Sequence, residues 1–84
     1  MDHYEAEEIY QNLPHRIRDI ADFKVKRDLT RMYKTCENLR RDISRESVNS
    51  RNQLNNHKLL DLRNKFSEAV TNLDQYVTLA LLTM

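Results

Sequence analysis

The sequence predicts an all-α protein, built as a long antiparallel helical hairpin that follows a short N-terminal helix and pairs with a second hairpin into a four-helix bundle. Three observations predict this fold class. The 84 residues include no glycine and one proline, which disfavours strand-and-turn folds and glycine-rich phosphate-binding loops. Apolar residues recur at steps of three and four along two long segments. The C-terminal segment, which ends in YVTLALLTM, carries two adjacent apolar rows.

The first predicted element is a short helix at about residues 3–12. Asp2 and Glu5 stand at the spacing of a capping box, which favours a helix start. Pro14 is expected to end this helix and to lie in the first turn of the next one. The apolar edge of the short helix consists of Ile9, Tyr10 and Leu13. Tyr10 also lies in a short motif, EEIYQNLP, that is typical of kinase sites and sorting signals, but its apolar neighbours favour packing.

The second predicted element is one long helix at about residues 14–46. Its apolar positions step by four and then, from Val25 onward, alternate steps of three and four as in a heptad seam. These positions are Leu13, Ile17, Ala21, Val25, Leu29, Met32, Cys36, Leu39 and Ile43. The alternative is a break in the chain, with Asp22 capping a separate helix that begins at Phe23.

The third predicted element is a helix at about residues 51–83, after a turn at about residues 47–50. The turn is placed there because residues 44–58 are rich in serine and asparagine, which favour caps and turns. One apolar row of the last helix steps regularly by three and four through Leu59, Leu62, Phe66, Ala69, Leu73, Tyr76 and Ala80. A second row beside it contains Val70, Val77, Leu81 and Met84.

The two rows of the last helix predict an association between chains. One row suffices to pack against the preceding long helix, so the other needs a further partner. A second hairpin supplies it in the four-helix bundle. In the alternative, a three-helix bundle formed by one chain, the short first helix covers this row. We expect the first helix to offer too few apolar side chains to do so.

Chemically specialised sites are not predicted. The three histidines are scattered, and Cys36 has no histidine or cysteine three or four residues away, so the spacing indicates no metal site. Neither a nucleophile elbow nor a glycine-rich loop is present. We therefore expect no enzymatic activity, no cofactor and no small-molecule substrate. The single cysteine favours an intracellular location, cytoplasmic or nuclear, and no segment has the length of a membrane span.

The function predicted from these patterns is an assembly module that forms a homodimer or docks a helical protein through its last helix. The expected interface residues are Leu59, Leu62, Phe66, Val70, Leu73, Tyr76, Val77 and Leu81. The alternative is a small nucleic-acid-associated regulator, because residues 23–51 carry a net charge of +5 in a chain whose net charge is +1. Its expected nucleic-acid contacts are Lys24, Arg27, Arg31, Lys34, Arg41 and Arg45.

Overall fold

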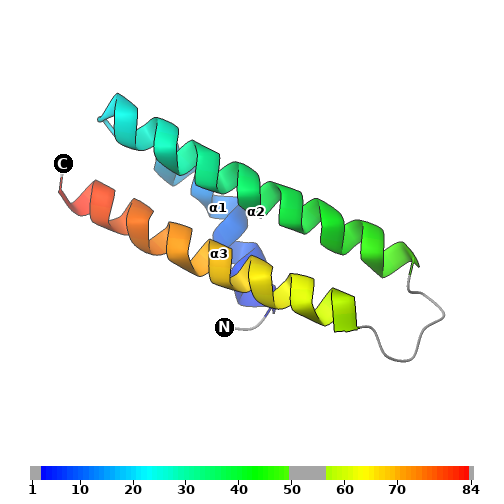
Figure 1. Cartoon of the computed structure of the whole chain (residues 1–84). Helices are drawn as coiled ribbons and strands as arrows, with labels where there is room; N and C mark the ends of the chain where they lie inside the picture. The colour runs from blue at the N-terminus through cyan, green and yellow to red at the C-terminus, as the bar shows by residue number, and fades with distance from the viewer. Residues whose placement is uncertain (1–2, 50–56, 84) are drawn as a thin grey trace.

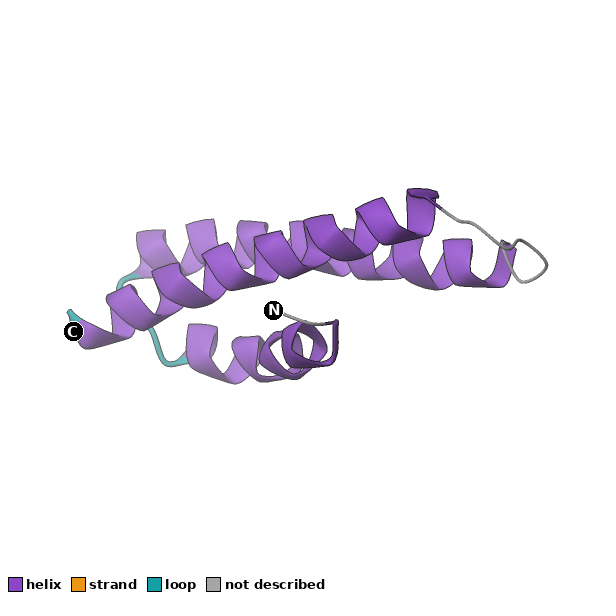
Figure 2. Cartoon of the chain, turned by 90° about the horizontal axis from the view of Figure 1, so that it is seen from below, coloured by secondary structure: helices purple, strands orange, loops and turns teal. Residues whose placement is uncertain are grey.

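The structure, a computed structural model, describes residues 3–49 and 57–83. Within these ranges the chain forms three α-helices, which are α1 (His3–Arg18), α2 (Phe23–Asn49) and α3 (His57–Leu82). The predicted all-α class is therefore confirmed. The two long helices α2 and α3 lie side by side as a pair, and α1 crosses behind them (Figure 1). Figure 2 shows α1 as a separate layer on one side of the pair, with no described helix on the other side.

The predicted helix boundary at Pro14 is wrong, because α1 continues through this residue to Arg18. A proline inside a helix lacks one hydrogen-bond donor and costs about 3 kcal/mol. On either side of Pro14, however, Leu13 and Ile17 are buried, with 0% and 5% of their surface exposed. Burying two such side chains contributes about 1.5–3 kcal/mol each. Packing therefore offsets the local penalty, and the first helix is longer than the predicted 3–12.

The predicted single helix at 14–46 is also wrong, and the alternative break before Phe23 is confirmed. The chain turns over residues 19–22, where the backbone N–H of Ile20 donates to the carbonyl of Ile17 at 3.1 Å. The side chain of Ile20 is only 4% exposed, so the turn contributes to the core. The apolar positions that step by four residues before Val25 therefore belong to two helices and the turn between them, and not to one continuous helix.

Asp22 caps the N-terminus of α2. Its Oδ1 accepts hydrogen bonds from the backbone N–H groups of Lys24 at 2.9 Å and Val25 at 3.1 Å. An aspartate in this position satisfies amide groups that have no partner within the helix. The cap fixes where α2 begins and therefore how far α1 can extend before the chain turns.

The predicted turn at 47–50 is only partly testable. The helix α2 extends to Asn49, so residues 47–49 are helical and not part of a turn. Residue 50 lies outside the described residues, as do residues 51–56 of the predicted last helix. The described part of that helix, α3, spans His57–Leu82. The prediction assigned residues 47–49 to a turn because Ser and Asn favour turns, whereas here they end a helix.

All three helices contribute to one core. The buried apolar residues are Ala6, Tyr10, Leu13, Ile17 and Ile20 from α1 and the turn, Leu29, Cys36 and Ile43 from α2, and Phe66, Val70, Leu73 and Val77 from α3. Leu29, Cys36 and Ile43 are spaced by seven residues and so form one stripe along α2. The free thiol of Cys36 is among these buried groups, and burial raises its pKa to about 11.

An aromatic cluster around Tyr10 joins the three helices. The ring of Tyr10 stacks on Tyr33 of α2, with centroids 5.1 Å apart, and meets Phe66 of α3 edge to face at 5.5 Å. The guanidinium group of Arg40 lies 5.4 Å from the Tyr10 centroid and pairs with Glu7 of α1 at 2.6 Å. Burial, and then hydrogen bonding to Tyr33, raise the pKa of Tyr10 above its usual range. The packing role expected for Tyr10 therefore fits its 6% exposure.

Candidate interaction surfaces

Four of the eight residues predicted to form an interface lie in the core of the chain itself. Phe66, Val70, Leu73 and Val77 are each 0% exposed. The expectation that the first helix is too small to cover the second apolar row is therefore wrong for the described residues of that row. The reason is that α1 runs past Pro14 to Arg18, so that Ile17 and, in the turn that follows, Ile20 add to the buried apolar residues. A docking surface on the folded chain must use other residues.

The remaining predicted interface residues differ in exposure. Leu59, Leu62 and Leu81 are half-buried and pack against the core, whereas Tyr76 is 55% exposed. Leu79, which was not among the predicted residues, is 59% exposed. Its position outside both apolar rows is the reason that the periodicity did not single it out.

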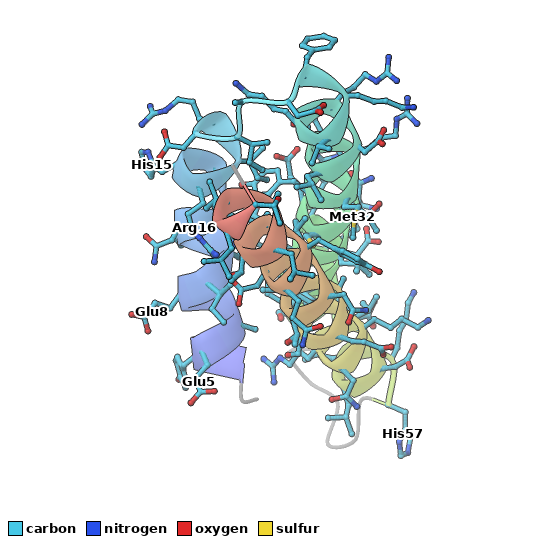
Figure 3. All side chains as sticks on the ribbon, turned by 90° about the vertical axis from the view of Figure 1, so that its left-hand side faces the viewer. Glu5, Glu8, His15, Arg16, Met32 and His57 are labelled. Atoms are coloured by element: carbon cyan, nitrogen blue, oxygen red, sulfur yellow. The ribbon has the colours of Figure 1, made fainter. Side chains whose placement is uncertain are left out.

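A polar contact shows which side of α3 faces α1. Arg16 of α1 pairs with Asp74 of α3, and its Nη2 donates to Oγ1 of Thr78 at 2.6 Å. Figure 3 shows Arg16 between the two helices. Tyr76 lies two residues from each of these α3 positions, and two residues turn a helix by about 200°. Tyr76 therefore lies on the side of α3 that faces away from α1.

The corresponding side of α2 also carries apolar residues. Figure 3 shows Met32 on the side of the bundle opposite α1. Leu39 follows Met32 by seven residues and Val25 precedes it by seven, so the three side chains form one column along α2. Val25 is 36% exposed, and the other two are half-buried.

We define the open face as the side of the α2–α3 pair that α1 does not cover. Its apolar residues are Val25, Met32 and Leu39 from α2 and Leu62, Ala69, Tyr76 and Leu79 from α3. The two helices bring these residues together because Val25 lies beside Ala80 and Thr83 at one end of the pair. At the other end, Glu46 of α2 pairs with Lys58 of α3 at 3.6 Å. The open face therefore has charged residues at its far end, and Asp28 and Arg31 border its apolar residues beside Met32.

The six predicted nucleic-acid contacts all lie on the outer surface of α2. Lys24, Arg27, Arg31, Lys34, Arg41 and Arg45 are exposed, and helical spacing places them within one face. Their surroundings differ along the helix. Glu37 lies 3.8 Å from Arg41 and 3.5 Å from Lys34, and Arg45 borders a groove that also contains Asp42 and Glu46. The second half of the basic face is therefore partly neutralised.

Three residues near the start of α2 were missed by the sequence prediction. Phe23, which the sequence analysis named only as the first residue of a possible separate helix, is 77% exposed beside this basic surface. Lys26 and Arg18 line a groove between α1 and α2, and Lys26 Nζ donates to the carbonyl of Arg18 at 3.1 Å. The chain reversal at residues 19–22 brings them together, which a prediction of one continuous helix could not show.

Metal-ligand clusters and membrane spans were sought among the described residues. Within residues 3–49 and 57–83, no group of three or more His, Cys, Asp or Glu side chains is placed to hold a metal ion. Across the same ranges, none of the helices is long and apolar enough to cross a membrane. Comparisons of this chain with known protein families, curated proteins and solved structures find no match. Functional inference therefore depends on the two surfaces described above.

Proposed function

We propose that this protein is a non-enzymatic assembly module whose open face binds the open face of a second copy. The supporting observation is that Tyr76 and Leu79 of α3 are exposed on the same open face as half-buried Met32 of α2. The exposed apolar surface of these side chains adjoins the contact between α2 and α3. A second copy of the chain packed there would remove this surface from water. Removing apolar surface from water contributes about 25 cal/mol per Å². Dimers with one two-fold axis are the commonest assemblies of soluble proteins.

The arrangement of large and small side chains suits pairing with an identical face. Ala69 precedes Tyr76 by seven residues, so a small and a large side chain follow one another along the same column. A two-fold axis between them, with the chains antiparallel, sets Tyr76 of each copy against Ala69 of the other. The ring of each tyrosine then occupies the space above an alanine. A face that is complementary to itself in this way favours a homodimer over an unrelated partner.

The size of the apolar region limits the strength of the dimer. From Val25 to Leu39 it spans about 21 Å of helix at about 1.5 Å per residue, and it is two helices wide. An interface of this size is at the small end of the range for stable complexes. We therefore expect a dissociation constant on the order of micromolar.

Sedimentation velocity over about 1–100 μM protein tests the proposal, because this range spans the expected dissociation constant. The wild-type chain should change from monomer to dimer across the range. Leu79→Glu should remain monomeric because it places a carboxylate in the interface. Leu60→Glu is the matched control, since Leu60 is a 58% exposed leucine of the same helix. It lies about 100° around α3 from Leu79.

Circular dichroism should show that both variants remain helical, since both leucines are exposed in the single chain. The proposal is wrong if the wild-type protein is monomeric throughout the concentration range. It is also wrong if Leu79→Glu associates as strongly as the wild type, or if Leu60→Glu and Leu79→Glu weaken association equally.

A further inference from the structure

Two shallow grooves meet at the first half of α2. The first runs between α1 and α2 and is lined by Pro14, Ile17, Arg18, Lys26, Thr30 and Tyr33. The second lies on the outer surface of α2 and is lined by Phe23, Lys26, Arg27, Thr30, Arg31 and Lys34. Because Lys26 and Thr30 line both grooves, the two form one continuous surface. We call this surface the Phe23 site.

The Phe23 site carries a strong positive charge. Among the described residues, neither Arg27 nor Arg31 has a carboxylate within the 4.0 Å of an ion pair. Lys34 has one neighbour, Glu37 at 3.5 Å, and its side chain is 67% exposed. The positive charge is thus available to an anion, in contrast to the partly neutralised second half of α2. Such a cluster attracts phosphate groups by releasing their counterions.

The exposure of Phe23 is the second observation. This ring is 77% exposed at the first residue of α2, although packing it would bury one of the largest apolar side chains of the chain. It borders the same groove as Arg27 and Arg31. An exposed aromatic ring beside cationic side chains is suited to stack on an unpaired base while the cations contact the backbone phosphates.

From these two observations we propose that the Phe23 site binds single-stranded nucleic acid, with Phe23 stacking on a base and Lys26, Arg27, Arg31 and Lys34 contacting phosphates. The bases of a duplex are stacked on one another and offer no free face to the ring, so single strands are favoured. An anionic membrane is disfavoured because the apolar stripe of α2, through Leu29, Cys36 and Ile43, is buried in the core. A helix bound to a membrane surface needs its apolar side for the lipid.

This inference does not depend on the proposed dimer. The Phe23 site and the open face meet on α2, where Arg31 and Met32 line one shallow groove, but Leu79 lies on α3 and lines neither groove of the Phe23 site. A monomeric variant such as Leu79→Glu therefore retains the site. Measuring binding with that variant separates failure of one proposal from failure of the other.

The first experiment is fluorescence anisotropy with a labelled oligothymidylate of about 16 nucleotides, a length within the range of single-strand sites. Four phosphate contacts predict that affinity falls about fifty-fold when NaCl is raised from about 50 to about 200 mM. Arg31→Glu should abolish most of the binding at the lower salt concentration. Arg63→Glu is the matched control, because it changes the net charge equally from an exposed position on α3. It should bind nearly as the wild type does.

The second experiment tests the ring. The chain contains no tryptophan, so Phe23→Trp introduces a single fluorescent reporter at the site. Stacking on a base should quench its emission, whereas phosphate contacts alone would leave the emission largely unchanged. Phe23→Ala should weaken binding to the oligothymidylate about tenfold without changing its salt dependence, since stacking releases no counterions.

The competing ligands are tested with the same protein. A duplex of the same length and vesicles rich in phosphatidylserine should bind more weakly than the single strand. Equal or tighter binding of the duplex would overturn the assignment to single strands, and preferential binding of vesicles would assign the site to a membrane. Absence of binding to the single strand at low salt, or equal loss of binding in Arg31→Glu and Arg63→Glu, would refute the proposal.

Discussion

Replacing Val77 by alanine tests the central packing result, that the second apolar row of α3 is buried in the three-helix core of one chain. Val77 is 0% exposed, and Val77→Ala removes two buried methyl groups. Each group contributes about 0.8 kcal/mol, and the cavity adds a further cost, so the free energy of unfolding should decrease by about 2–3 kcal/mol. A chain of this size has a stability on the order of 4–13 kcal/mol, so the variant should still fold. Its Tm should fall by about 8–24 °C.

The control is Leu79→Ala, a larger truncation on the same helix at a position that is 59% exposed. Exposed substitutions of this kind change stability by about 0.5 kcal/mol or less. Urea denaturation followed by circular dichroism measures both variants, at a protein concentration low enough to favour the monomer. If the free energy of unfolding of Val77→Ala lies within about 0.5 kcal/mol of the wild-type value, Val77 is not buried in the single chain and the core described above is refuted.

Three further predictions concern the turn, the contact between α1 and α3, and the buried thiol. Asp22→Ala should destabilise the protein by about 1 kcal/mol through loss of the cap, while Asp19→Ala should have little effect in the same urea titration. A double-mutant cycle with Arg16→Ala and Asp74→Ala should give a coupling of about 0.5–1 kcal/mol, since both side chains are partly exposed; no coupling would contradict the contact. Because burial raises the pKa of Cys36 from 9.0 to about 11, the folded state retains a proton that the unfolded state loses. The free energy of unfolding should therefore decrease as the pH rises from 9 to 11. The decrease should be smaller for Cys36→Ala, and urea titrations at both ends of this pH range measure it for the two proteins.

The sequence is sufficient to predict the helical class and the stripes that form the core, but not how the first helix packs. The heptad-spaced residues Leu29, Cys36 and Ile43 are buried as their periodicity indicates. Pro14 shows the limit of predicting helix boundaries from local sequence. Its conformational preference favours a helix boundary, but the burial of residues on both sides keeps it within the helix. That burial depends on a core shared with α2 and α3, which no local pattern contains.

The two surfaces were also predictable to different degrees. The basic residues of α2 share a face by spacing alone, so their exposure could be expected from the sequence. The contact of Lys26 with the carbonyl of Arg18 could not, since it requires the chain to reverse at residues 19–22. Tyr76 was identified from its apolar row, whereas Leu79 becomes a candidate only when the position of α1 is known.

The short connection at residues 19–22 makes α1 a tethered ligand of the α2–α3 pair. A segment held by so few residues has an effective concentration on the order of millimolar or higher at the site it occupies. A helix from another protein would have to exceed this value to displace α1, even if it fitted the groove equally well. Competition from α1 thus disfavours binding of other helices to the side of the α2–α3 pair that α1 covers. Occupancy of the opposite side is governed only by the concentration and affinity of the molecule that binds there.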